Sequence, residues 1–224
     1  MNAIILAAGL GSRLKPLTKE VPKPLVKVNG LSLIERQIYL LKEAGICEII
    51  IVIGYMNDKF KFLEKKYNVK LIYNNKYKEY NNIYSLYLAQ DYLNNTYILE
   101  GDVYLTKNLF IENLKHSTYF AVKKEMYENE WVLKYDNKKR LEEIYIGYEK
   151  GAYVMSGISY WNIDDTKVIK DKLNKLIKNK NFKNLYWDDI VRKEVENFNI
   201  NVKEVDFNCV YEIDTVEDLE NVPY

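Results

Sequence analysis

The first 25 residues, Met1–Leu25, read MNAIILAAGLGSRLKPLTKEVPKPL, and this stretch decides how the rest of the chain is interpreted. The apolar run Ala3–Leu6 has the length of a β-strand, and small residues and glycines follow it directly. A strand that enters such a loop can bring backbone N–H groups close to a phosphate chain, because no large side chain intervenes. Two familiar loops are excluded. No Gly-Lys-Ser/Thr sequence follows, and Gly9 and Gly11 lack the third glycine of the dinucleotide-binding fingerprint.

Two cations follow the glycines. Arg13 offers a planar, permanently charged fork that suits two phosphate oxygens. Lys23 stands between Pro22 and Pro24, which restrict the direction of the backbone on either side of it. The glycines alone fit an ordinary surface loop as well as a phosphate site. Together with the arginine and the proline-flanked lysine, they favour phosphate binding.

Length and composition narrow the class of protein. A chain of 224 residues with 48% hydrophobic and 29% charged residues is typical of a globular protein, and we expect one domain over residues 1–224. The net charge of +1 argues against nucleic acid as a partner.

Cys47 and Cys209 lie far apart in the sequence and are expected to be reduced thiols. No apolar stretch reaches the ~20 residues of a membrane span, and the N-terminal run is too short for a signal peptide. We therefore expect a cytoplasmic protein with no membrane partner.

Strand-like and helix-like segments alternate in the first half. The predicted strands are Ala3–Leu6, Glu48–Ile53, Val69–Tyr73 and Tyr97–Glu100. The predicted helices are 33–44, ended by Gly45, then Asn57–Lys66 and Ile83–Tyr92. This alternation predicts an α/β fold with a Rossmann-like, mixed, mostly parallel sheet that is flanked by helices. Ligands of such sheets bind at the carboxyl ends of the strands.

The second half changes character and predicts an antiparallel β insertion. The strands expected there are Thr118–Lys123, Trp131–Tyr135, Arg140–Ile146 and Ala152–Trp161, with a hairpin turn at Asp136–Lys139. The helices Asp165–Ile177 and Trp187–Phe198 and the strand Asn201–Val205 are expected to follow.

Two aspartates stand where a metal could bind. Asp102 follows Gly101 at the end of a predicted strand, and Asp214 precedes Thr215, which can begin a helix. Carboxylates at this edge of a sheet suit Mg²⁺, which also takes phosphate and water oxygens. Each aspartate alone fits a turn or a helix cap equally well. Paired, they become candidate ligands of one metal ion.

Aromatic residues and acids occur together at two places, NEWVLKY (129–135) and LYWDDIV (185–191). Aromatic faces with carboxylates nearby can hold an ammonium group by cation–π attraction and charge. Packing in the core is the better interpretation for any single aromatic residue. The repetition of the pattern shifts this balance modestly towards an ammonium site.

The stretch AAGLGSRLKPLTKEVPKPLV (7–26) resembles the signature of the nucleotidyltransferases that activate sugar phosphates and related phosphates, G-x-G-[ST]-R-L-x-P-L-T followed by Pro-Lys. GDVYL (101–105) and YEIDTVEDL (211–219) are similar to the two metal-binding stretches of the family, so the resemblance covers nearly the whole chain. Within the family, YNNIYSLYLA (80–89), SGISYW (156–161) and the two aromatic stretches resemble bacterial CTP:phosphocholine cytidylyltransferases. Neither a β-helix repeat nor a fused kinase domain is expected.

The resemblance implies roles for particular residues. Arg13 and Lys23 would be catalytic, Arg13 at the β- and γ-phosphates and Lys23 at the reacting α-phosphate, while Mg²⁺ would be a cofactor held by Asp102 and Asp214. The implied nucleotide-binding residues are Leu6, Ala7, Ala8, Gly9, Gly11, Ser12, Asn82, Ser85 and Gly101. The implied acceptor-binding residues are Trp131, Tyr186, Trp187, Asp188 and Glu212.

The implied activity is CMP transfer from CTP to phosphocholine, which yields CDP-choline and pyrophosphate for decoration of the cell surface. A phosphate monoester has a second pKa of about 6 and is already an anionic nucleophile at neutral pH, so no base is needed. The single histidine, His116, is accordingly expected at the surface.

Several alternatives stay open. The acceptor could be phosphoethanolamine, aminoethylphosphonate, phosphoglutamine or a sugar 1-phosphate, and a catalytically silent regulatory domain that binds a nucleotide is the non-enzymatic alternative. The sequence also leaves open the strictness for CTP, the oligomeric state (a homodimer included), and whether Tyr77–Asn82 forms a mobile lid.

Overall fold

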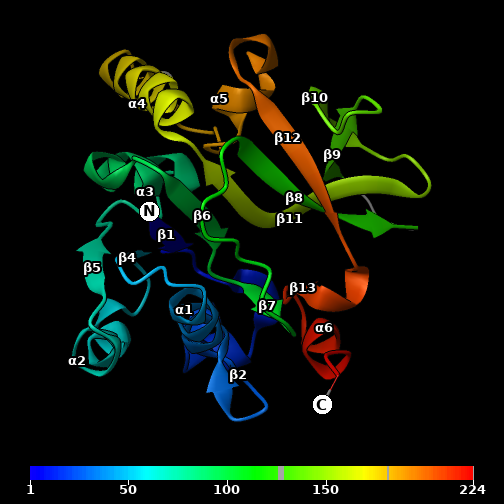
Figure 1. Cartoon of the computed structure of the whole chain (residues 1–224). Coiled ribbons are helices and arrows are strands. Elements are labelled where there is room, and N and C mark those ends of the chain that lie inside the picture. The colour runs from blue at the N-terminus through cyan, green and yellow to red at the C-terminus, as the bar shows by residue number, and fades with distance from the viewer. Residues whose placement is uncertain (126–128, 181, 224) are drawn as a thin grey trace.

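Figure 1 shows the computed structural model of the chain, which describes residues 1–125, 129–180 and 182–223. Within these residues a nine-stranded sheet occupies the centre, with the order β10-β9-β11-β6-β1-β4-β5; in addition β8 pairs with β11, and β12 pairs with β8. Its strands are β1 (Asn2–Ala7), β4 (Ile49–Ile53), β5 (Lys70–Tyr73), β6 (Thr96–Glu100), β8 (Ser117–Lys124), β9 (Glu130–Tyr135), β10 (Leu141–Gly147), β11 (Ala152–Trp161) and β12 (Ile200–Val205).

Two small sheets and six α-helices complete the described elements. The small sheets pair β2 (Lys27–Val28) with β3 (Leu31–Ser32), and β7 (Val103–Leu105) with β13 (Val210–Glu212). The α-helices within the described residues are α1 (Leu33–Glu43), α2 (Phe62–Tyr67), α3 (Asn82–Leu88), α4 (Ile163–Lys178), α5 (Asp189–Arg192) and α6 (Val216–Glu220).

The first half forms the predicted parallel sheet. β1 pairs in parallel with β4 on one side and with β6 on the other, and β4 pairs in parallel with β5. In the register of these pairs Leu6 lies beside Glu100 and Ala7 beside Ile53, so the carboxyl ends of three strands meet at one edge. The loop that opens the chain and the turn that carries Asp102 therefore leave the sheet side by side.

The second half is antiparallel with one exception. β11 runs antiparallel to β6 and β8, and β9 and β10 form a hairpin whose predicted turn is confirmed, with the N–H of Lys139 donating to the carbonyl of Asp136 at 2.9 Å. β12 instead pairs in parallel with β8. A parallel partner needs a crossover connection, which the segment containing α4 and α5 provides.

Helices cover both faces of the sheet, as predicted (Figure 1). Ile5 and Ile51 face one layer of the core with Ile38 of α1 and Leu63 of α2. Their neighbours along the strands, such as Ile4, face the opposite layer with residues of α3 and α4. Successive side chains of a strand point to opposite faces, so a strand buried on both faces is apolar throughout. The uninterrupted apolar run of β1 reflects this position.

Three predicted helices are shorter than expected. The predicted helix Asn57–Lys66 is divided into a 3₁₀ turn, Asn57–Phe60, and α2. The predicted helix Ile83–Tyr92 consists of α3 followed by the 3₁₀ turn Gln90–Tyr92. The predicted helix Trp187–Phe198 contains only α5 and the 3₁₀ turn Val195–Asn197. Apolar residues three apart face the same side in a 3₁₀ turn as well as in an α-helix, so the spacing did not distinguish the two.

α1 begins with a capping box in which Ser32 and Glu35 bond each other's backbone N–H groups. The Glu35 carboxylate also accepts hydrogen bonds from Lys66 at 2.9 Å and Tyr67 at 2.8 Å. Burial opposes ionisation of this carboxyl, but the hydrogen bonds from Lys66, Ser32 and Tyr67 outweigh it and lower the pKa of Glu35 to about 2. The capping box therefore ties the first turn of α1 to α2.

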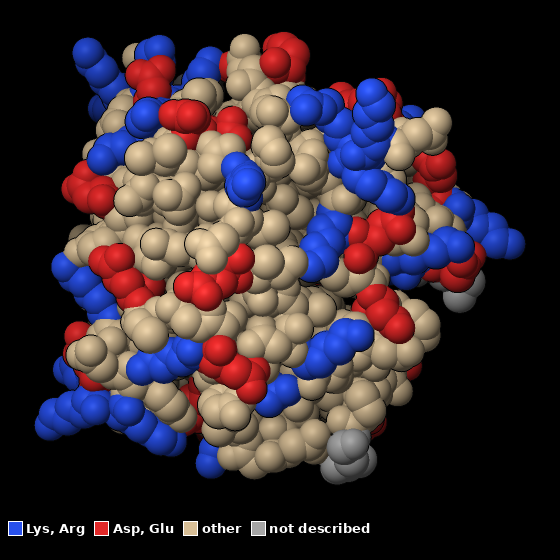
Figure 2. Space-filling view, in the orientation of Figure 1, with Lys and Arg blue, Asp and Glu red and all other residues tan. Residues whose placement is uncertain are grey.

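The surface carries mixed charge. Figure 2 shows Lys and Arg interspersed with Asp and Glu over the face in view, as a net charge of +1 predicts. His116 is exposed, which confirms the expectation that it lies at the surface, and Cys47 and Cys209 are free thiols. Among the described residues, no helix has both the length and the apolar character that crossing a membrane requires.

Candidate active site

A cavity of about 400 Å³ lies where β1 and β6 end. It brings together most of the residues that the sequence analysis selected. Those that line it are Leu6, Ala7, Ala8, Gly9, Gly11, Ser12, Arg13, Lys23, Asn82, Ser85, Gly101, Asp102, Tyr186 and Asp214. Trp131, Trp187, Asp188 and Glu212 are outside this set.

Gly11 fixes the shape of the opening loop. Its φ of +60° is in the left-handed region that glycine adopts most readily, and a Cβ atom there would lie only 2.9 Å from the Cβ of Lys23. The hydroxyl of Thr18 donates to the carbonyl of Gly11 at 2.8 Å, which closes the loop on itself. Any side chain at position 11 would therefore push Lys23 away from the pocket.

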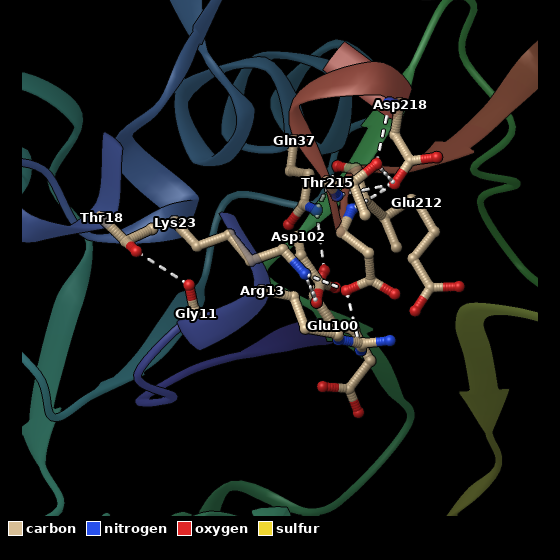
Figure 3. A network of polar contacts seen from close by, with 12 residues as sticks. Gly11, Arg13, Thr18, Lys23, Gln37, Glu100, Asp102, Glu212, Thr215 and Asp218 are labelled. Carbon is tan, nitrogen blue, oxygen red and sulfur yellow. Dashed lines mark hydrogen bonds and ion pairs between the residues drawn. The ribbon is translucent and has the colours of Figure 1, made fainter. Parts of the chain in front are cut away.

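Lys23 is the centre of an ion-pair network (Figure 3). Its ammonium donates to Asp102 at 2.7 Å and to Asp214 at 2.6 Å, and its side chain is 10% exposed. Burial lowers the pKa of Lys23, but the two carboxylates outweigh burial and raise it, so the lysine is charged. Arg13, which is 72% exposed, reaches Asp214 at 2.9 Å. Lys23 is thus buried in the pocket, whereas Arg13 is largely exposed to solvent.

The two aspartates come from distant parts of the chain. Asp102 is in the turn between β6 and β7, and its carbonyl accepts a hydrogen bond from the N–H of Ile213 at 3.1 Å. β13 pairs antiparallel with β7, which carries Asp214 to the same place. Gln37 of α1 stabilises the turn that contains Asp102, because its amide donates hydrogen bonds to the carbonyls of Glu100 and Val103 at 2.9 and 2.7 Å.

Glu212 joins the aspartates. One carboxylate oxygen from each of Asp102, Glu212 and Asp214 lies within 4.8 Å of the others. Burial and the neighbouring charges of Asp102 and Asp214 raise the pKa of Glu212 to about 7. Three hard oxygen donors in this arrangement fit a divalent cation such as Mg²⁺, which takes carboxylate ligands and completes its shell with phosphate and water. The sequence analysis assigned Glu212 to the acceptor instead, so the structure adds a second possible role.

We call three of the predicted acceptor residues the acceptor corner: Trp131 and Tyr186, whose rings are in contact, and Glu212. The rings of Trp131 and Tyr186 lie edge to face with centroids 6.1 Å apart. Lys124 pairs with Glu130, the neighbour of Trp131, at 2.5 Å and approaches Glu212 at 4.0 Å. Tyr186 lines the main cavity, so this corner adjoins the ion-pair network.

Trp187 and Asp188 lie elsewhere. Trp187 is 2% exposed and packs edge to face against Trp161, with centroids 5.6 Å apart, so its ring belongs to the core. Asp188 accepts a hydrogen bond from Tyr119 at 2.9 Å and lines a separate cavity of about 30 Å³. Burial raises the pKa of Asp188 to about 7. The structure therefore does not bring these two residues to the wall of the main cavity.

Some residues of the pocket were missed by sequence reasoning. Asn74, Tyr77 and Tyr80 line the cavity although none was selected. Asn74 directly follows β5, and a polar residue at a strand end is the same pattern that identified Asp102. Gln37 also had a detectable pattern, because it is a polar residue within the apolar stripe of α1.

The fold and this pocket define a class of protein: an α/β protein whose pocket brings together a glycine loop, two cations and two carboxylates, an arrangement that suits a phosphate-bearing ligand. Comparison with known proteins gives the family. The family model described as nucleotidyl transferase matches residues 2–203, and the chain belongs to the nucleotidyl transferase family.

Individual relatives agree over nearly the whole length. The chain is 44% identical to a choline-phosphate cytidylyltransferase of Streptococcus pneumoniae, over 97% of this chain and 95% of that protein. It is 39% identical to a choline-phosphate cytidylyltransferase of Haemophilus influenzae, over 99% and 96% of the two chains. The solved structure of the CTP:phosphocholine cytidylyltransferase of Streptococcus pneumoniae superposes with a TM-score of 0.96 at 43% identity, over 99% and 96% of the two chains.

Proposed function

We propose that this nucleotidyltransferase transfers CMP from CTP to phosphocholine and releases pyrophosphate. The observation that carries the proposal is the contact of Lys23 with both Asp102 and Asp214 beside the acceptor corner. The two relatives named choline-phosphate cytidylyltransferase support the choice of nucleotide and acceptor. The proposed substrates, CTP and phosphocholine, support a cytoplasmic location.

The chemistry needs alignment and charge more than proton transfer. A phosphate oxygen of the acceptor attacks the α-phosphorus of CTP, a new P–O bond forms, and the bond to the β-phosphate breaks to release pyrophosphate. The exposed Arg13 would contact the β- and γ-phosphates, while the buried Lys23 would lie near the α-phosphate, where charge accumulates. Both cations reduce the repulsion between the two anionic substrates.

Asp102 and Asp214, with Glu212 beside them, are the residues that would hold Mg²⁺. When bound, the ion would neutralise phosphate charge and orient the triphosphate. The chain's own part is to keep two carboxylates at the end of β6 and β13, a position that the β7–β13 pairing and Gln37 maintain.

The acceptor corner suits a quaternary ammonium. Trp131 and Tyr186 offer π-faces, and Asp214, which lines the same cavity as Tyr186, supplies negative charge. The guanidinium of Arg192 lies 5.7 Å from the ring centroid of Trp131, so one face of the indole already has a cation. The acceptor ammonium would use the remaining aromatic surface.

The test is pyrophosphate release with CTP, Mg²⁺ and a panel of acceptors: phosphocholine, phosphoethanolamine, aminoethylphosphonate, phosphoglutamine and glucose 1-phosphate. We expect turnover to be fastest with phosphocholine. Faster turnover with a primary-amine acceptor would leave the proposed CMP transfer intact but show that phosphocholine is not the preferred acceptor. No pyrophosphate release with any acceptor would contradict the proposal and favour a regulatory domain.

A further inference from the structure

The main cavity has two chemically different ends. The charged end consists of Arg13, Lys23, Asp102 and Asp214, and the neutral end consists of Asn74, Tyr77, Tyr80 and Ser85. A nucleoside triphosphate is charged at one end and neutral at the other. Its phosphates need the cations, so its base is directed to the neutral end. Ala8 and Gly9 also line the cavity, and their small size leaves room for the ribose.

Asn74 has a fixed orientation at the neutral end. Its side chain is buried, and its Oδ1 accepts a hydrogen bond from the N–H of Lys76 at 2.8 Å. A backbone N–H can only donate, so this contact decides which end of the amide is the oxygen. The amide nitrogen of Asn74 consequently faces Ser85 and donates to its hydroxyl oxygen at 3.0 Å.

Ser85 is thereby constrained to be a donor. It is 3% exposed on α3, and one lone pair of its hydroxyl is occupied by Asn74. Within the described part of the chain the hydroxyl hydrogen of Ser85 has no acceptor, although the side chain borders the cavity. A buried hydroxyl without an acceptor is unfavourable, so a ligand that supplies one gains affinity.

We propose that Asn74 and Ser85 set the preference for cytosine over uracil nucleotides, with the Ser85 hydroxyl donating to N3 of the base. The inference rests on the proposed function, because it assumes that a pyrimidine nucleotide enters this pocket. N3 of cytosine carries a lone pair, whereas N3 of uracil carries a hydrogen. With uracil, the hydroxyl hydrogen or the N3–H of the base stays unpaired in a buried site. Ser85 is the specificity residue, and Asn74 is a positioning residue that acts through it.

Two variants test the two roles. Ser85→Ala removes the donor, and we expect the ratio of CTP affinity to UTP affinity to fall about tenfold. Asn74→Asp has a sharper consequence. The carboxylate that replaces the amide can only accept, so the Ser85 hydroxyl turns to donate to it and presents a lone pair to the base. We expect this variant to bind UTP more tightly than CTP.

The measurement is calorimetric titration of CTP and of UTP into each protein with Mg²⁺ and without an acceptor. Asn162→Asp is the matched control, because Asn162 caps α4 outside the cavity and aspartate caps helices equally well. Its affinity ratio should equal that of the parent protein.

Three outcomes would overturn the inference: equal affinity of the parent protein for CTP and UTP, an unchanged ratio in Ser85→Ala, or an unchanged ratio in a folded Asn74→Asp. Circular dichroism establishes folding, and Ser85→Ala decides alone if Asn74→Asp does not fold. Since no acceptor is present, the result does not depend on whether phosphocholine is the acceptor. Failure of the proposed function would appear in the acceptor panel instead.

Discussion

The charged end of the pocket and the acceptor corner are held in different ways. At the charged end, Lys23 contacts Asp102 and Asp214 at 2.7 and 2.6 Å, and the pairing of β7 with β13 brings the two aspartates together. At the acceptor corner, the rings of Trp131 and Tyr186 lie 6.1 Å apart, and Glu212 approaches Lys124 at 4.0 Å. Charged hydrogen bonds therefore hold the charged end, whereas a single ring contact joins the two aromatic residues of the acceptor corner.

The largest expected effect tests the charged end. Lys23→Ala should lower kcat on the order of 10²–10³-fold, because a preorganised cation is lost and two carboxylates are left facing each other. The measurement is the rate of pyrophosphate release with CTP and phosphocholine. Lys61→Ala is the matched control, since Lys61 is an exposed lysine whose ion pair with Asp58 is at the surface. A near-normal kcat for Lys23→Ala would contradict the assignment of the reaction chemistry to the charged end.

A smaller effect is expected at the acceptor corner. Trp131→Ala should raise KM for phosphocholine about tenfold and leave KM for CTP nearly unchanged, because it removes a π-face from a residue that does not line the main cavity. Steady-state kinetics with each substrate varied in turn would measure both constants. Tyr39→Ala, an exposed aromatic residue on α1, is the control. An equal rise in both KM values would mean that the two regions are not separable.

Glu212 lies at the boundary between the two regions. Glu212→Gln should raise KM for phosphocholine about fivefold through the loss of one partly exposed charge. The same variant should be titrated with Mg²⁺ at saturating substrates. If the Mg²⁺ dependence shifts while KM for phosphocholine does not, Glu212 belongs to the charged end and the acceptor corner is reduced to its aromatic rings.

The smallest effect concerns stability. Its hydrogen bonds lower the pKa of Glu35 from the ordinary value of 4.5 to about 2 in the folded protein, so they stabilise the protein above pH 4.5. This contribution is lost as the pH falls through 4.5 towards 2, because the unfolded chain then binds a proton before the folded one does. The difference in free energy of unfolding between the parent protein and Glu35→Gln should shrink by about 2 kcal/mol between about pH 6 and about pH 2.5.

Urea denaturation at the two pH values measures this difference. Glu64→Gln, an exposed acid on α2, should show almost no pH-dependent difference from the parent protein. A Glu35→Gln difference that does not vary with pH would contradict the assigned pKa. It would also mean that the hydrogen bonds of Glu35 in the capping box do not stabilise α1.

Sequence reasoning predicted the charged end better than the acceptor corner. Strand alternation and the loop of Gly11, Arg13 and Lys23 are local patterns, and the parallel sheet they predict is confirmed. The rotation of an aromatic side chain is not a local property. Nothing adjacent to Trp187 in the sequence distinguishes it from Tyr186, yet one ring lies in the core and the other lines the cavity.

The sequence by itself determined the phosphate loop and the strand ends that carry the chemistry, because glycine conformation, proline restriction and apolar periodicity act over a few residues. Only the tertiary structure decided that Asp214 meets Asp102, that Glu212 joins them, and that Asn74 orients Ser85. These contacts follow from strand pairing and packing between distant segments. The energy of such pairing depends on the whole core and cannot be read from any short stretch.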